Sequence, residues 1–168
     1  MQAFGTNITD VEWLYREHGS ALVLFATAIA GERSGAQDAV HQVFLKLIEG
    51  GSLRQVLDAK AYLFACVRNA VLNDAKVRQR NVAFDSESAW FNVPNRDYAA
   101  ELDLQRALCA LPGDQRQVTV LHIWGELTFS QVADVLGISS NTAASRYRYA
   151  LAKLREAMCA KEDFRANS

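Results

Sequence analysis

Apolar residues recur at helical spacing along most of the chain, and glycine-containing breaks divide them into separate stretches. The pattern predicts helices from about residue 9 to 30, 34 to 49 and 58 to 80, and further helical segments from residue 98 to about 158. Periodicity fails over residues 81–97, which we interpret as a linker. The chain is therefore predicted to be all-α, with two small helical domains over residues 8–80 and 98–160.

Two polar pairs are candidate caps for the first two helices. Thr9 and Glu12 have the spacing of a capping box, in which each side chain satisfies a backbone N–H that has no partner at a helix start. Ser34 and Gln37 have the same spacing before the second helix. A glycine pair beginning at Gly50 predicts that this helix ends near residue 49.

The second predicted helix has one apolar and one polar face. The apolar face is expected to be buried and comprises Ala36, Val40, Val43, Phe44, Leu47 and Ile48. The opposite face carries Asp38, His41, Gln42, Leu45 and Glu49. Leu45 stands out on this polar surface and indicates a protein partner, although single exposed leucines are common.

Near the C-terminus, two helical patterns flank a glycine turn. Thr128 and Gln131 form a capping-box pair, and the apolar residues that follow lie on one helical face: Phe129, Val132, Ala133 and Leu136. Gly137 can adopt the left-handed conformation that ends a helix, and Ser139 or Ser140 can cap the next one. This order is typical of a helix-turn-helix.

The second helix of this motif has an inner face expected to be buried, made of Ala143, Tyr147, Ala150, Leu151, Leu154 and Met158. Its outer face is small at the start and basic beyond, which suits a helix that enters the DNA major groove. The candidate DNA contacts are Ser140, Asn141, Thr142, Ser145, Arg146, Arg148, Tyr149 and Lys153. We expect Arg148 to contact a base or a phosphate, and Arg146 and Lys153 to contact flanking phosphates.

Charge is segregated along the chain, although the formal net charge is only −1. Residues 60–80 carry five basic side chains and one acidic, and residues 136–168 carry six and three. Between them, residues 81–103 carry one basic side chain and five acidic, so the predicted linker is acidic. Two separate basic segments predict two nucleic-acid contacts, although solvated helix faces also produce charge runs.

Several other classes of protein are disfavoured. The N-terminus lacks the basic region of a signal peptide, and the longest apolar run, residues 21–30, is too short to cross a bilayer, so we expect a cytoplasmic protein without membrane contact. The three cysteines form no CxxC pair and are interpreted as unreactive thiols. The sequence offers no catalytic motif, metal-ligand cluster or phosphate loop, so we expect no enzyme activity, metal or cofactor.

These motifs together resemble a known family. The Thr-x-x-Ser-Arg element at residues 142–146 and the Ala-Leu-x-x-Leu-Arg element at residues 150–155 resemble region 4 of bacterial RNA polymerase sigma factors. Residues 38–47 look like region 2.2, and residues 61–80 look like regions 2.3 and 2.4. Because only a linker separates regions 2 and 4, the resemblance is to the extracytoplasmic-function group (group 4) of the sigma-70 family.

The resemblance implies an alternative sigma factor that binds core RNA polymerase, recognises −35 and −10 promoter elements and opens DNA. It implies contact of Asp38, His41, Gln42, Leu45 and Glu49 with the β′ clamp helices of the polymerase, whose β flap is a further contact. The −10 contacts are Asn69, Asn73, Lys76, Arg78 and Arg80, with an unstacked base near Asn69 and the loop of residues 51–60 as the pocket wall. An anti-sigma factor is a further implied partner.

The chain departs from the family pattern at several positions. His41-Gln42 stand where region 2.2 usually has Gln-Glu, Ala143-Ala144 replace a valine and a basic residue, and Tyr149 replaces an arginine. The DNA sequence that this chain prefers at the −35 element therefore cannot be inferred from other members of the family. We expect Arg148 to supply the positive charge that the family has at the next position, where this chain has Tyr149. We expect Tyr149 to stack or pack on the sugar-phosphate backbone.

Two other functions remain open from the residues. A helix-turn-helix regulator would use its first domain to sense a ligand or to dimerise, and it would bind promoter DNA without polymerase. An interaction protein with no DNA role would leave both basic segments unexplained.

Overall fold

The computed structural model describes residues 8–50, 53, 56–78 and 98–166, and in these residues it contains seven α-helices and no strand. The N-terminal unit comprises α1 (Ile8–Ala30), α2 (Arg33–Glu49) and α3 (Ala59–Arg78). The C-terminal unit comprises α4 (Tyr98–Ala110), α5 (Gly113–Ile123), α6 (Phe129–Leu136) and α7 (Ser140–Ala166). The all-α prediction is confirmed, while the predicted linker and Arg80 lie outside the described residues.

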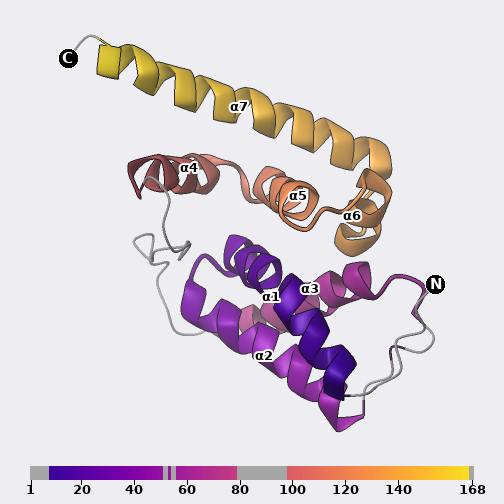
Figure 1. Ribbon diagram of the computed structural model, residues 1–168. Helices are drawn as coiled ribbons and strands as arrows, with labels where there is room; N and C mark the ends of the chain where they lie inside the picture. The colour runs from indigo at the N-terminus through magenta and orange to yellow at the C-terminus, as the bar shows by residue number, and fades with distance from the viewer. Residues whose placement is uncertain (1–7, 51–52, 54–55, 79–97, 167–168) are drawn as a thin grey trace.

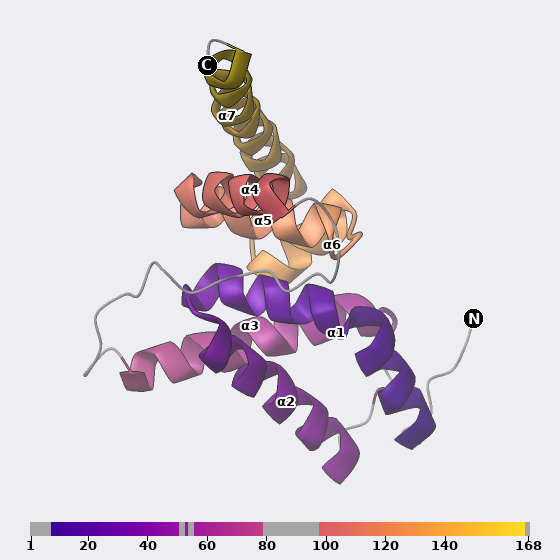
Figure 2. The same cartoon turned by 60° about the vertical axis from the view of Figure 1, so that its left-hand side comes forward.

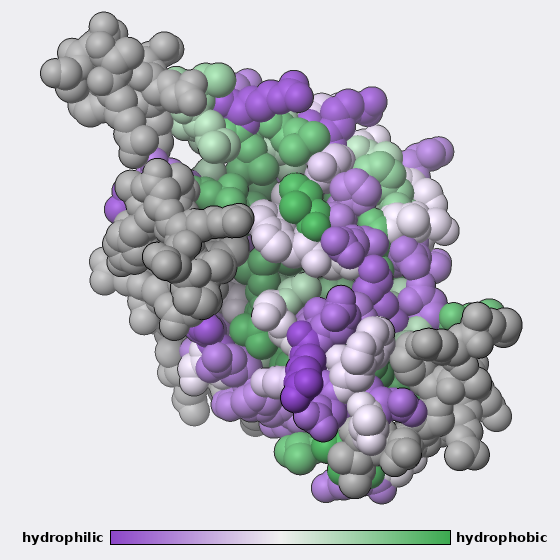
Figure 3. Space-filling view, viewed as in Figure 1, coloured by the Kyte–Doolittle hydropathy of each residue, from purple (hydrophilic) through white to green (hydrophobic). Residues whose placement is uncertain are grey.

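The helices are stacked in layers, as Figures 1 and 2 show. The three helices of the N-terminal unit pack against one another, with Phe25 of α1 and Phe64 of α3 in edge-to-face contact at a ring-centroid distance of 5.6 Å. Helices α4, α5 and α6 lie over this unit, and α7 crosses them on the far side. Figure 3 shows hydrophilic surface along α7 and hydrophobic surface beneath it, where α7 covers the helices below.

Glycine turns end the helices where the sequence predicts. Gly50 (φ 144°) follows α2 and Gly137 (φ 68°) follows α6, so both have the positive φ that side chains with a Cβ avoid. The turn between α4 and α5 contains Leu111 and Pro112.

Other predicted details are wrong. Thr9 lies inside α1 and Ser34 inside α2, whose N-cap is Glu32 without a side-chain hydrogen bond. Ile48 (53% exposed) and Met158 (50% exposed) are not buried, although each continues the apolar stripe of its helix. Ile48 is the second-last residue of α2, where the helix runs out of its packed region. Helix α7 also continues to residue 166, past the predicted end near residue 158.

The capping box of α6 is present as predicted. The Thr128 hydroxyl accepts a hydrogen bond from Gln131 N at 3.2 Å, and Gln131 Oε1 accepts one from Thr128 N at 2.8 Å. Replacing Thr128 with Ala removes the first bond and is expected to lower the stability of the protein by about 1 kcal/mol. Thermal unfolding should show a melting temperature about 3 °C lower. Ser130→Ala, at an exposed position of the same helix turn, is the control, and equal melting of both variants would contradict the role of the cap.

Helix α5 joins the two units into one core. Four successive residues, Val118 to Leu121, are buried because α5 is packed between α1 on one side and α7 on the other. The side chains of Val118 and Leu121 belong to the same hydrophobic cluster as Phe25 and Phe64 of the N-terminal unit. The middle of α5 is therefore stabilised by neighbours on two faces.

Arg116 of α5 holds the end of α4 in place. Its Nε donates to Leu108 O at 3.0 Å, and its Nη2 donates to the carbonyls of Cys109 and Leu111, both at 2.9 Å. Its Nη1 lies 3.4 Å from Ala28 O of α1. The last carbonyls of a helix have no partner within the helix and carry partial negative charge, so a guanidinium is well suited to them.

Candidate nucleic-acid interface

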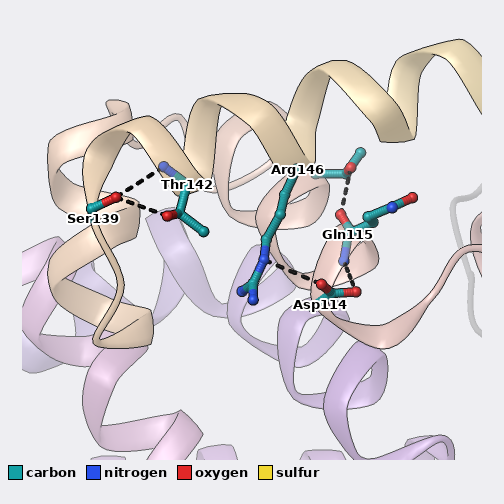
Figure 4. A network of polar contacts seen from close by, with 6 residues as sticks. Asp114, Gln115, Ser139, Thr142 and Arg146 are labelled. Carbon is teal, nitrogen blue, oxygen red and sulfur yellow. Dashed lines mark hydrogen bonds and ion pairs between the residues drawn. The ribbon is translucent and has the colours of Figure 1, made fainter.

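The helix-turn-helix is built from α6 and α7, and its turn is held by local hydrogen bonds. Ile138 N donates to Ala133 O at 3.1 Å, which closes the end of α6 around Gly137. Ser139 Oγ then accepts from Thr142 N at 3.0 Å and lies 2.8 Å from Thr142 Oγ1 (Figure 4). The predicted serine cap of α7 is therefore Ser139, and the first turn of α7 is fixed to the turn that precedes it.

Three aromatic side chains set the orientation of α7 against α5 and α6. The ring of His122 stacks on Phe129 at 4.4 Å between centroids and meets Tyr147 edge-on at 4.6 Å. His122 Nδ1 lies 2.8 Å from Leu127 O, so this nitrogen donates to the carbonyl. Tyr147 was placed on the inner face of α7 by its helical spacing, and this position is confirmed. The sequence pattern did not indicate that His122 takes part in this contact.

The outer face of α7 is open and positively charged. Between Ser140 and Arg155 the helix carries four basic residues and no acidic one. Asn141, Arg148, Tyr149 and Lys153 are exposed, whereas Ala143, Ala150 and Leu154 are buried. The guanidinium of Arg148 lies 5.9 Å from the centre of the Tyr149 ring, within the range of a cation–π contact. These two predicted side chains therefore lie together on the accessible face.

Two other predicted contacts make bonds within the protein. Arg146 Nε pairs with Asp114 Oδ2 of α5 at 3.2 Å, and Figure 4 shows the side chain reaching from α7 down to the start of α5. Thr142 directs its hydroxyl to Ser139. Ser145 is half-buried, whereas Ser140 at the start of α7 is exposed. The predicted contacts on α7 that are accessible in this structure are therefore Ser140, Asn141, Arg148, Tyr149 and Lys153.

The second predicted DNA-binding face lies on α3. Asn69, Asn73 and Lys76 are all exposed and follow one another along this helix. Arg78 is the last residue of α3, and its side chain is outside the described part. Two amides that can hydrogen-bond to base edges and a cation suited to phosphate thus share one helix.

The polar face of α2 is exposed as predicted at Asp38, His41, Gln42, Leu45 and Glu49. The Tyr15 hydroxyl lies 3.2 Å from His41 Nε2, and the Tyr15 ring packs edge-on against Phe44. Ile48 adds a second large apolar side chain beside Leu45, and the sequence pattern missed it. We call Leu45 and Ile48 the apolar pair of α2.

The described residues offer little for other chemistry. No group of three His, Cys, Asp or Glu side chains among them could hold a metal ion. Burial raises the pKa of the Cys66 thiol and of the Cys109 thiol, so both remain protonated at neutral pH. In the described part of the chain, every helix is too short or too polar to span a membrane.

Comparison with known proteins gives a consistent result over both units. A family model described as Sigma-70 region 2 matches residues 14–81, and one described as Sigma-70, region 4 matches residues 101–154. The ECF RNA polymerase sigma factor SigL of Mycobacterium tuberculosis is 29% identical over 153 residues, covering 84% of this chain and 85% of SigL. The ECF RNA polymerase sigma factor EcfG of Rhodopseudomonas palustris is 26% identical over 140 residues, covering 80% of this chain and 77% of EcfG.

Solved structures share the fold. The sigma factor RpoE in complex with the anti-sigma factor NepR from Bartonella quintana superposes with a TM-score of 0.73 at 22% identity, covering 90% of this chain and 98% of RpoE. CnrH in complex with the cytosolic domain of CnrY gives a TM-score of 0.62 at 24% identity, covering 92% of this chain and 90% of CnrH. The helical arrangement of both units is thus that of these proteins.

Proposed function

The chain belongs to the sigma-70 family, in its extracytoplasmic-function group, and on this premise we propose how its helices direct transcription initiation. Helix α2 binds the β′ clamp helices of core RNA polymerase, and the β flap is a second contact. Helix α3 takes up the −10 element through Asn69, Asn73 and Lys76, and α7 reads the −35 element in the major groove.

The observation that carries this proposal is the pair of DNA-binding faces on one chain. Between Ser140 and Arg155, α7 carries basic and no acidic residues behind a well-capped turn, and α3 exposes two asparagines one helical turn apart. The first face suits duplex DNA, whereas the amides of α3 suit bases that have left the duplex. A protein that recognises one duplex element and opens another needs both.

We propose further that the protein acts by binding alone, without catalysis, and works in the cytoplasm. Opening DNA at a promoter requires binding energy for unstacked bases, and no bond in the DNA is broken. An anti-sigma factor is a proposed inhibitory partner, since the related RpoE and CnrH were solved in complexes, RpoE with an anti-sigma factor.

A helix-turn-helix regulator is the competing function, and a binding experiment separates the two. A sigma factor needs core polymerase to bind promoter DNA well, whereas a regulator binds the duplex by itself. Mobility-shift titrations of a target promoter with this protein, with and without core polymerase, should show a specific complex only when both proteins are present. Tight specific binding without polymerase would support the regulator.

Replacing Arg148 with Ala is expected to weaken −35-dependent transcription about tenfold while polymerase binding is unchanged, because one base or phosphate contact is lost. Run-off transcription measures the first quantity, and co-purification with core polymerase measures the second. Arg155→Ala removes the same charge from an exposed position further along α7 and serves as the control. Unchanged promoter use by the Arg148 variant would overturn this assignment.

A further inference from the structure

Asp114 and Arg146 form an ion pair within the C-terminal unit, at the edge of the face proposed to bind DNA. Arg146 Nε lies 3.2 Å from Asp114 Oδ2, and the pair joins the second turn of α7 to the first turn of α5 (Figure 4). The Arg146 side chain is 32% exposed and that of Asp114 is 48% exposed. Because ion pairs in contact with solvent add little to stability, the main effect of this pair is on where the arginine side chain lies.

The carboxylate of Asp114 is itself held in place. Its Oδ1 accepts a hydrogen bond from Gln115 N at 2.9 Å, in the first turn of α5. The N–H groups at a helix start have no partner within the helix and carry partial positive charge, so a carboxylate is favoured there. Thr119, which is fully buried, donates its hydroxyl to Gln115 O at 2.8 Å. The anchor of Arg146 is thus part of a helix start that is tied to the core.

The ion pair leaves most of the arginine donors available. A guanidinium has five N–H groups, and only one of them is on Nε. In the described part of the chain, Nη1 and Nη2 of Arg146 make no hydrogen bond, and Figure 4 shows them pointing away from Asp114. Two parallel N–H groups of an arginine match two oxygens of a phosphate. Arg146 therefore presents a fork that is free to bind an anion.

Arg146 lies on the flank of α7 and not at its centre. Thr142, Arg146, Tyr149 and Lys153 follow one another at helical spacing, so they form one row along this flank. Tyr149 and Lys153 are exposed, and the two basic side chains of the row are about 10 Å apart along the helix axis. A helix in the major groove has a sugar-phosphate backbone at each flank. The row is therefore placed to meet phosphates.

We propose that Asp114 is a positioning residue for DNA binding: it holds the Arg146 guanidinium at the flank of α7, with the terminal nitrogens turned towards a phosphate. The proposal rests on the proposed function of α7 as the helix that reads the −35 element. A long side chain loses rotamer freedom when it binds, and one that is already held loses less. Water and the intervening guanidinium weaken the repulsion between the Asp114 carboxylate and that phosphate.

Asp114→Ala is expected to weaken promoter binding about fivefold, because Arg146 loses its anchor. Arg146→Ala should weaken it about tenfold, and the D114A/R146A double variant should bind like R146A, since Asp114 acts only through Arg146. Mobility-shift titrations of the full-length protein with core polymerase measure these affinities, on a promoter that the wild type uses in run-off transcription. Asp134→Ala removes the same charge from an exposed position on α6 and should bind like the wild type.

This double-mutant cycle separates positioning from two simpler roles of Asp114. If the carboxylate only repelled DNA, D114A would bind more tightly than the wild type. If it only stabilised the start of α5, D114A would weaken binding in the R146A background as well. Either result would overturn the positioning role. Circular dichroism verifies that each variant is folded. Should D114A fail to fold, Asp114→Asn, which has nearly the same size, takes its place in the cycle, with a loss of about threefold expected.

The proposed function is read out separately, by wild-type titrations with and without core polymerase. The cycle is measured on whichever DNA complex forms, so binding by the free protein alone would contradict the sigma function and still test Asp114. Salt dependence tests the phosphate contact, since R146A should lower the slope of log affinity against log salt concentration by about one. An unchanged slope and affinity, or no DNA complex at all, would overturn the role of Asp114.

Discussion

Core RNA polymerase is expected to bind the Leu45→Glu/Ile48→Glu double variant at least about 100-fold more weakly than the wild type. The apolar pair of α2 is about half exposed in the free protein (55% and 53%), so there is little stability to lose on substitution. Burying two such side chains against a partner contributes about 3 kcal/mol, and a buried unpaired carboxylate adds a further penalty. A difference of that size corresponds to more than two powers of ten in Kd.

Fluorescence anisotropy with labelled protein and purified core polymerase measures this Kd. Met158→Glu is the matched control, since Met158 is equally exposed but lies on α7, away from the α2 face proposed to bind the β′ clamp helices. The control should bind like the wild type. If the double variant bound polymerase as tightly as the control, α2 would not be the docking helix.

Arg116→Met is expected to destabilise the protein by about 3 kcal/mol, because three carbonyls around the end of α4 lose their hydrogen bonds to the guanidinium. Thermal unfolding should show a melting temperature lower by roughly 6–12 °C. Burial lowers the pKa of Arg116, but an arginine remains charged at every pH used for folding. The loss of stability caused by Arg116→Met should therefore be nearly independent of pH between 6 and 8.

Arg116→Lys separates geometry from charge. Lysine keeps the charge but cannot reproduce the planar fork that reaches several carbonyls at once, so most of the loss is expected to remain. Arg106→Met, at an exposed position of α4, is the control and should melt like the wild type. A fully stable lysine variant would show that charge alone holds the end of α4.

The helix-turn-helix was predictable because its signals are local. The cap at Thr128, the left-handed turn at Gly137 and the cap at Ser139 each depend on residues within four positions of one another. Helical spacing likewise placed the polar face of α2 and the exposed residues of α7 correctly. Such features depend on residues close by in the sequence, and little on contacts with distant parts of the chain.

Features that depend on distant contacts could not be predicted in this way. Periodicity cannot show that α5 is covered on both sides, nor that Gln131 reaches a carboxylate 73 positions away. It also cannot show where a neighbouring helix stops, which is why Ile48 was expected to be buried. The roles of Arg116 and His122 depend on acceptors exposed by turns, which a hydrophobic pattern does not record.

The most direct test of a sigma factor is run-off transcription with purified core RNA polymerase on a genomic promoter library, with core polymerase alone as the control. New start sites that depend on this protein and share paired upstream elements near −35 and −10 are the predicted result, and they would define both motifs. The absence of protein-dependent initiation, together with specific duplex binding by the free protein, would contradict the proposal and indicate a helix-turn-helix regulator.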